Sequence, residues 1–213
     1  MPYTVKEMYL TLQGEGAQAG RAAVFCRFTG CNLWNGREAD RATAACRFCD
    51  TDFIGIDGPG GGRFADANAL ATTISEAWRR TSGRSGRPYV VFTGGEPALQ
   101  LDEALVTALR DKGFEVGIET NGTKALPKGI DWVCVSPKPR CQVVVQSGQE
   151  LKFVYPQDEI HPEDFSNWAF EHFFIQPKDG PEVRENTALA TTYCLANPQW
   201  RLSLQTHKLI GIP

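Results

Sequence analysis

Residues 31–51, CNLWNGREADRATAACRFCDT, hold three of the seven cysteines of this 213-residue chain. Fourteen residues separate Cys31 from Cys46, and two separate Cys46 from Cys49. The Cys-x-x-Cys pair puts two sulfurs on one short turn, and the third thiolate comes from the end of an upstream strand. A structural zinc site needs four closed ligands, and an electron-transfer iron–sulfur cluster also needs four cysteines. Three thiolates therefore indicate a metal centre with one position open to a substrate or cofactor.

Other interpretations of the cysteines remain open at this point. A Cys-x-x-Cys pair in a cytosolic protein is often a zinc knuckle or a thioredoxin-type redox pair. The redox interpretation leaves Cys31 without a role. The zinc interpretation needs a fourth ligand, for which Cys26 is available, although a buried small hydrophobe is the more ordinary role for it. Cys134 and Cys194 fit the same ordinary role, and Cys141 is expected to be a bystander.

Composition restricts the class of protein. The net charge of -3 and the pI near 5.7 argue against a nucleic-acid-binding surface, which needs a basic stripe. No stretch approaches eighteen apolar residues, so we expect no membrane span, and the N-terminal MPYTVKEMYL is unlike a secretory signal. An odd number of cysteines without such a signal favours thiols or metal ligands over disulfides. We therefore expect a cytoplasmic protein with no nucleic acid or membrane partner.

Outward from the cysteine stretch, strands alternate with helices or long connections. The predicted strands are Ala22–Thr29, Tyr89–Phe92, Phe114–Ile118, Trp132–Val135, Leu151–Val154 and His172–Ile175. The predicted helices are Ala65–Arg80, Leu101–Lys112 and Val183–Ala196, and the tail after Trp200 begins strand-like. This order is typical of an α/β protein with a mostly parallel sheet. A complete barrel typically needs about 250 residues, so we predict a partial, open TIM-like barrel of about six strands with few helices. No repeat or linker divides residues 1–213, which indicates one domain; residues 32–45 are expected to form a loop leading into a short helix.

Four of these strands run directly into polar or glycine residues. The four motifs are Thr93-Gly94-Gly95-Glu96-Pro97, Glu119-Thr120-Asn121-Gly122, Ser136-Pro137-Lys138 and Gln176-Pro177-Lys178-Asp179. Ligands of parallel sheets bind at this carboxyl edge. By itself the first motif is also compatible with an ordinary turn. Facing a metal centre, its glycines would expose backbone groups, and Glu96 can accept a hydrogen bond from an ammonium group.

Arg27 lies inside a predicted strand, where a charge is costly unless it is paired. It can pair with a surface carboxylate at an edge strand. It can equally present its fork-shaped guanidinium to the carboxylate of a bound ligand. The strand alone leaves these two interpretations open.

Taken together, these residues resemble the radical S-adenosylmethionine (SAM) superfamily, whose usual spacing is Cys-x3-Cys-x2-Cys. Along nearly the whole chain the sequence resembles one of its families, the 7-carboxy-7-deazaguanine synthases of queuosine biosynthesis, some of which carry an enlarged first cysteine gap. The resemblance is carried by Leu12-Gln13-Gly14-Glu15-Gly16, the cysteine gap, Phe48-Cys49-Asp50-Thr51 and the four strand-end motifs.

The resemblance implies the cofactors and the residues that hold them. Cys31, Cys46 and Cys49 would bind three irons of a 4Fe-4S cluster in the cluster-binding loop 31–51, and SAM would chelate the fourth iron. The SAM pocket would comprise Phe48, Cys49, Asp50, Gly94, Gly95, Glu96, Ser136, Pro137, Lys138, Gln176, Pro177, Lys178 and Asp179. Thr51 would ligate Mg²⁺, a hard cation that prefers oxygen ligands; without a cluster, Asp50-Thr51 reads as a simple turn or cap.

The resemblance also implies the substrate, 6-carboxy-5,6,7,8-tetrahydropterin, and its radical-mediated ring contraction with loss of ammonia. Residues implied in substrate binding are Leu12, Gln13, Gly14, Glu15, Arg27, Thr93 and, from a tail that closes the site, Pro213. Glu119 and His207 are implied as further substrate contacts or proton-transfer groups, although a lone histidine in a tail is usually structural. A flavodoxin or similar reductant would deliver the electron, and the chain would form a homodimer.

Two rival functions remain. A radical SAM activase that places a radical on a protein glycine would present an open, protein-sized surface and give Arg27 and Thr51 no particular role. A non-enzymatic zinc- or cluster-binding module would use the cysteines for structure alone. Metal content distinguishes the zinc module from a cluster protein.

Overall fold

The computed structural model describes residues 2–80 and 86–213, and within them one nine-stranded sheet carries the molecule. The strand order is β3-β1-β2-β4-β5-β6-β7-β8-β9. The strands are β1 (Tyr3–Leu12), β2 (Ala22–Phe28), β3 (Gly62–Phe64), β4 (Tyr89–Gly94), β5 (Glu115–Thr120), β6 (Trp132–Val135), β7 (Ser147–Tyr155), β8 (Ala169–Pro177) and β9 (Arg201–Leu202). The α-helices are α1 (Ala67–Arg79), α2 (Glu103–Asp111), α3 (Val183–Ala196) and α4 (Thr206–Ile210).

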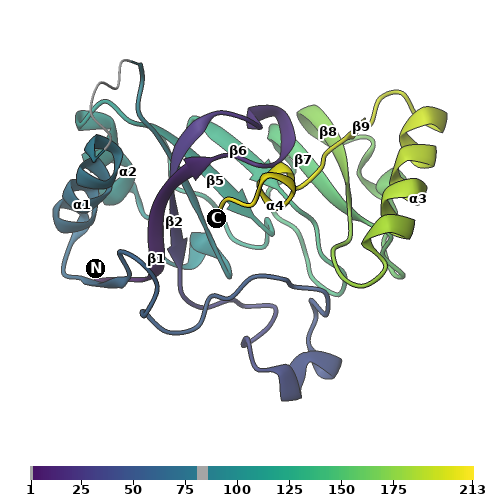
Figure 1. Ribbon diagram of the computed structural model, residues 1–213, viewed down its shortest axis with the longest axis horizontal. Helices are drawn as coiled ribbons and strands as arrows, with labels where there is room; N and C mark the ends of the chain where they lie inside the picture. Colours follow the sequence, from purple (N-terminus) through teal and green to yellow (C-terminus); the bar gives the residue numbers. More distant parts are fainter. Residues whose placement is uncertain (1, 81–85) are drawn as a thin grey trace.

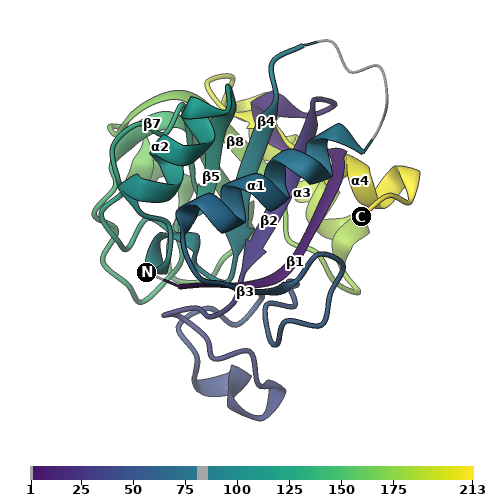
Figure 2. The ribbon, with the colours of Figure 1, turned by 90° about the vertical axis from the view of Figure 1, so that its left-hand side faces the viewer.

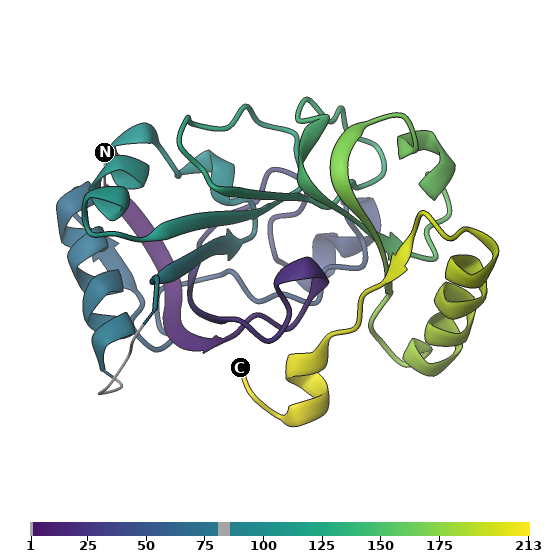
Figure 3. The ribbon, with the colours of Figure 1, turned by 90° about the horizontal axis from the view of Figure 1, so that it is seen from above.

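The sheet is mostly parallel and curved, and it does not close. All pairings from β2 to β9 are parallel, whereas β1 is antiparallel to both β2 and β3. Figure 3 shows the curvature, with α1 beside one end of the sheet and α3 beside the other. The prediction of a partial, open, mostly parallel α/β barrel is confirmed. The sheet is larger than the predicted six strands, because β1, β3 and the short β9 extend its edges.

Alternation along the strands separates a core face from a pocket face. On β2, Val24, Cys26 and Phe28 are fully buried in the main hydrophobic core. Their neighbour Arg27 lies on the opposite, concave face. On β7, Leu151 and Phe153 enter a second core, while Lys152 between them faces the pocket. The same two-residue period that builds the cores therefore aims the charged side chains at one cavity.

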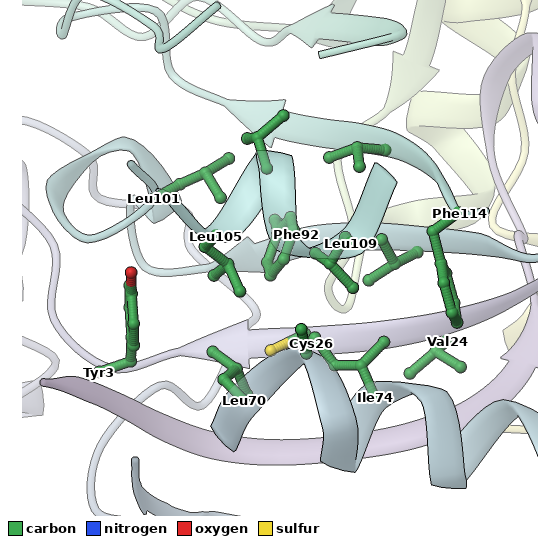
Figure 4. Close-up of a cluster of buried hydrophobic side chains, with 14 of the residues drawn as sticks. Tyr3, Val24, Cys26, Leu70, Ile74, Phe92, Leu101, Leu105, Leu109 and Phe114 are labelled. Carbon is green, nitrogen blue, oxygen red and sulfur yellow. The ribbon is translucent and has the colours of Figure 1, made fainter. Parts of the chain in front are cut away.

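The helices α1, α2 and α3 cover the outer face of the sheet. Figure 4 shows side chains of α1 and α2, among them Leu70 and Leu105, meeting Phe92 of β4 in the main core. Both helices begin at an aspartate whose carboxylate accepts a backbone N–H: Asp66 from Ala69 and Asp102 from Leu105. This is the usual N-cap arrangement. Among the described residues, no helix is long and apolar enough to span a membrane.

The segment after β2 projects away from the sheet, as Figures 1 and 2 show from two directions. It contains a six-residue 3-10 helix, Glu38–Thr43, with irregular chain on both sides. The Arg41 guanidinium lies 4.0 Å from the centre of the Trp34 ring, which packs edge-on against Phe53 at 5.6 Å. The predicted loop and short helix are both present, with the helix in the middle of the segment rather than at its end. Three further short 3-10 turns are Gly16–Gln18, Pro97–Leu99 and Pro162–Phe165.

Candidate active site

A pocket of about 370 Å³ lies on the concave face of the sheet. Strand ends, the cysteine segment and the C-terminal tail all contribute to its wall. The residues predicted from the sequence that line it are Leu12, Gln13, Gly14, Glu15, Arg27, Cys46, Phe48, Cys49, Asp50, Thr51, Thr93, Gly94, Gly95, Glu119, Ser136, Lys138, Gln176, Pro177, Asp179, His207 and Pro213. Segments from nearly the whole length of the chain therefore converge on one cavity.

Four of the predicted site residues do not line the pocket: Cys31, Glu96, Pro137 and Lys178. Glu96 is fully buried behind it, and its carboxylate accepts hydrogen bonds from the Ala98 N–H (2.9 Å), the Thr120 hydroxyl (2.7 Å) and the Asn121 N–H (2.7 Å). Burial raises the pKa of Glu96, against these hydrogen bonds. The structure thus gives Glu96 the task of joining the end of β4 to the end of β5.

The cysteine segment reaches the pocket through close packing against Gly95. A β-carbon at Gly95 would overlap the Gly30 carbonyl oxygen and lie 2.7 Å from the Cys31 β-carbon. The Glu96 N–H donates to the same Gly30 carbonyl at 2.9 Å. Cys31 is therefore fixed directly behind the glycine turn, while Cys46 and Cys49 line the cavity itself.

The thiols fit a cluster better than a single ion. Burial raises the pKa of Cys31 and of Cys49. Across residues 2–80 and 86–213, no three His, Cys, Asp or Glu side chains converge to hold one metal ion. A zinc site requires such convergence, whereas the cysteines of an iron–sulfur cluster are attached around a multi-iron centre. Cys46 and Cys49 in the cavity wall, with Cys31 behind the glycine turn, are consistent with the latter.

Two polar groups stand beside the cysteine segment. The Lys138 ammonium donates to the Ser136 carbonyl (2.9 Å) and hydroxyl (2.6 Å). It also lies 5.8 Å from the centre of the Phe48 ring. The β6 strand end is thus anchored next to the residue that precedes Cys49.

A buried ionic network forms the opposite part of the wall. The Lys152 ammonium donates to Glu15 at 2.6 Å and to Glu119 at 2.8 Å. The side-chain amides of Gln205 and Gln13 donate to the same carboxylates, at 2.9 Å to Glu15 and 3.1 Å to Glu119. Burial alone would raise the pKa of Glu15, but Lys152 and Gln205 lower it below its ordinary value. Lys152 was not predicted from the sequence, although a lysine inside the apolar run 151–154 is the same kind of signal that marked Arg27.

Arg27 makes the carboxylate pair considered from the sequence and also faces the pocket. Its Nε donates to Glu7 at 2.8 Å and one terminal nitrogen donates to the Tyr9 hydroxyl at 3.1 Å. Its side chain also lines the pocket, beside Thr93, its register partner on β4. Glu7 and Tyr9, both on β1, line the pocket too and were missed because β1 was not predicted.

The C-terminal tail is attached across the open side of the sheet (Figure 3). The Thr206 N–H and hydroxyl both donate to the Gly14 carbonyl, at 2.9 and 2.8 Å. The Lys208 ammonium bridges Asp50 (2.8 Å) and Asp179 (2.6 Å), and the Thr11 hydroxyl donates to the Pro213 carbonyl oxygen at 2.8 Å.

His207 occupies the space that Gly14 leaves free. A β-carbon at Gly14 would overlap the imidazole ring. Burial lowers the pKa of His207, and the neighbouring Lys208 acts in the same direction, against the attraction of Glu15. The imidazole is therefore neutral around pH 7 and packs as an uncharged ring against the backbone.

Comparisons with known proteins identify relatives of this chain. No family model matches the chain. It is 65% identical over 213 residues to the 7-carboxy-7-deazaguanine synthase of Bordetella pertussis and 63% identical over 212 residues to that of Bradyrhizobium diazoefficiens, covering 100% of each chain in both cases. The crystal structure of QueE from Escherichia coli matches with a TM-score of 0.70 at 26% identity, over 97% of this chain and 95% of that one.

Proposed function

Because the chain belongs to the 7-carboxy-7-deazaguanine synthase family, we propose that it is the enzyme that converts 6-carboxy-5,6,7,8-tetrahydropterin to 7-carboxy-7-deazaguanine. The ring contracts and one molecule of ammonia leaves, a step of queuosine biosynthesis. The observation that carries the proposal is the pocket itself. It joins the cysteine segment, the glycine turn at Gly95 and a set of charged groups able to hold a small polar substrate.

Cys31, Cys46 and Cys49 would hold a 4Fe-4S cluster, and SAM would complete it. When bound and reduced, these cofactors supply the radical that removes a hydrogen atom from the substrate. Gly95 lets the cysteine segment pack against its backbone, and it lines the pocket together with Ser136, Lys138, Gln176 and Asp179. These polar groups would meet the amino, carboxylate and ribose groups of SAM.

The remaining wall would receive the substrate. Arg27 would bind its carboxylate, because a guanidinium matches a carboxylate in charge and geometry. Thr51 would hold Mg²⁺ with its hydroxyl oxygen, next to the carboxylate of Asp50. Leu12, Gln13, Gly14 and Thr93 would contact the pterin, and Glu119 would move a proton. The tail, ending at Pro213, would keep water from the reacting atoms.

Finer aspects of the function follow from the family. Residues 1–213 would act as one domain, with loop 31–51 binding the cluster and the tail closing the site. A flavodoxin or similar one-electron donor would reduce the cluster. The enzyme would be a cytoplasmic homodimer.

Anaerobic turnover tests the proposal. The purified enzyme, reconstituted with iron and sulfide, is incubated with SAM, dithionite, Mg²⁺ and 6-carboxytetrahydropterin. We expect 7-carboxy-7-deazaguanine and ammonia in equal amounts, without net consumption of SAM. Formation of 5′-deoxyadenosine in proportion to SAM, with no deazapurine, would point to another radical SAM activity. A colourless protein that retains zinc and no iron would support the non-enzymatic metal-binding module.

A further inference from the structure

Lys152 is a charged residue whose position the fold itself does not require. It lies in the middle of β7, between two fully buried core residues, and its own side chain is 6% exposed. Burying an ammonium group is costly unless hydrogen-bonded partners compensate it. A third apolar or neutral residue at this position would spare the protein that cost. The lysine is therefore best explained by the groups it contacts.

Those groups come from distant parts of the chain and face the pocket. Glu15 follows β1, Glu119 is the penultimate residue of β5, and both carboxylates contact the same Lys152 nitrogen. Each carboxylate also accepts one side-chain amide, from Gln205 and Gln13 respectively. Two carboxylate oxygens offer about four acceptor sites, so each glutamate keeps capacity for a further donor. Both glutamates line the cavity.

We propose that Lys152 is a positioning residue that holds Glu15 and Glu119 as a fixed pair of ionised acceptors for the N–H groups of the substrate. This inference rests on the proposed function, since a reduced pterin carries amino and ring N–H donors along its edges. A pair of carboxylates held in this state accepts hydrogen bonds and donates none. The lysine thereby matches the wall to a ring rich in donors.

The neighbouring groups leave this task to Lys152. The titratable groups around the two glutamates, apart from the lysine, are Glu150 of β7, Cys134 of β6, Tyr89 of β4 and His207 of α4. Burial raises the pKa of Glu150, Cys134 and Tyr89, and burial lowers the pKa of His207. None of these four contributes a positive charge around pH 7. Burial would lower the pKa of Lys152 itself, but the surrounding acidic groups raise it well above its ordinary value, so it stays charged.

Removal of the lysine charge is expected to change the protonation of the pair. Two carboxylates that lose the cation they both contact are expected to hold one proton more tightly, because like charges disfavour double ionisation. One glutamate would then present an O–H donor to an N–H donor of the substrate, and the two cannot form a hydrogen bond. Substrate binding should recover only when higher pH removes that proton.

The test compares Lys152→Met and Lys152→Arg with the wild-type holoenzyme from about pH 6 to about pH 9. The quantities are kcat, KM and the substrate affinity by anaerobic equilibrium dialysis. For Lys152→Met we expect kcat/KM about tenfold lower at pH 7, mainly through KM, if the proton held by the pair leaves about one unit above pH 7. The loss should shrink as the pH rises. Lys152→Arg, which keeps the charge, should retain the wild-type pH profile.

Controls separate this role from a merely structural one. Lys112→Met, at the exposed end of α2, should leave the profile unchanged. If Lys152→Met does not fold, Glu119→Gln is compared with the double variant Glu119→Gln/Lys152→Met. The double variant lacks one charge of each sign. In the Glu119→Gln background, removing the lysine should still move the acidic limb of the kcat/KM profile to higher pH, because Glu15 loses its cation. An equal loss at every pH, or an unchanged limb, would overturn the inference, whereas a wild-type enzyme that makes no product would refute the proposed function instead.

Discussion

At the scale of single residues, the ion pairs of the pocket join side chains from different segments. Arg27 of β2 is held by Glu7 of β1, and Lys152 of β7 is held by Glu15 and Glu119. These pairs are only partly exposed, so their charges are weakly screened and retain fixed directions. The pocket therefore presents pre-oriented charges to a ligand, which avoids the cost of ordering them during binding.

Arg27→Gln is expected to weaken substrate binding while leaving the cluster in place. The variant loses a charge-assisted contact to the substrate carboxylate, worth about 1.5–3 kcal/mol, so KM should rise about 10- to 100-fold. The measurements are steady-state kinetics and iron content per chain. Arg21→Gln is the matched control, because Arg21 also pairs with a glutamate, Glu115, but outside the pocket. Equal kinetic losses in the two variants would contradict a substrate contact at Arg27.

Gly95→Ala is expected to abolish cluster binding without unfolding the protein. The added methyl group would overlap the Gly30 carbonyl oxygen and the Cys31 β-carbon, so the cysteine segment must move away from β4. Iron content and visible absorbance after anaerobic reconstitution measure the effect. Gly113→Ala is the control, because it adds a methyl group at a position with open space around it. This control carries a backbone strain of its own, since φ at Gly113 is 84°. Full iron content in Gly95→Ala would show that the close packing is dispensable.

How far the sequence predicts the site depends on what each residue contacts. Most of the predicted residues at the carboxyl ends of parallel strands line the pocket, because the strand period and the edge rule are local properties. Glu96 belongs to the same motif, yet it turns away to accept three hydrogen bonds from segments that only the fold brings together. Lys152 was missed for the converse reason. Its partners lie 137 and 33 residues away, and no local pattern reports them.

At the scale of elements, the strands and helices with a long regular pattern were predicted within a few residues, and the irregular ones were not. The bounds of α3 and β6 agree with the prediction. β1 was missed because its register shifts between Val5 and Glu7, which breaks the alternation that identifies a strand. α4 was missed because five residues are too few to show a helical period. Contacts with Gly14, Asp50 and Asp179 define α4, and these are tertiary.

Docking of α4 is expected to weaken as the pH falls below about 6.5. Burial lowers the pKa of His207 in the docked tail, so protonation favours the undocked tail, where the pKa is ordinary. The stabilising contribution is complete above the ordinary pKa and is lost as the pH falls through the lower, docked value. Lys208 adds repulsion to a charged imidazole, while Glu15 and Asp50 oppose it.

Hydrogen exchange of the peptide covering residues 204–213, corrected for the intrinsic pH dependence, measures this effect. Protection of the wild-type tail should fall between about pH 7 and pH 5. His207→Gln, which cannot be protonated, should show protection independent of pH over the same interval. A wild-type tail whose protection stays constant would mean that the ion pairs of Lys208, rather than the neutral imidazole, determine docking.

At the scale of the whole molecule, two separate cores support one pocket. The core under α1 and α2 supports β1, β2, β4 and β5, and the core under α3 supports β6, β7 and β8. The cysteine segment and Arg27 extend from the first half, whereas Lys152 and Gln176 extend from the second. The tail connects the two, since it hydrogen-bonds to Gly14 and Thr11 after leaving β9. Because the sheet is open, the relative position of its halves depends on the continuous strand ladder and on this tail.

Leu105→Ala is expected to destabilise the whole chain, because β4 and β5 rest on the core that Leu105 completes. The side chain is fully buried and packs with residues of α1, β2 and β4. Its truncation should lower the free energy of unfolding by about 2–5 kcal/mol through lost apolar burial and a residual cavity. Leu195→Ala on α3, where the side chain is 83% exposed, should change it by less than about 0.5 kcal/mol. Guanidinium unfolding followed by tryptophan fluorescence measures both. Trp78 packs with the first core and Trp200 with the second. A single unfolding transition in Leu105→Ala would mean that the two halves unfold together. Two transitions would mean that the ladder between β5 and β6 does not couple them.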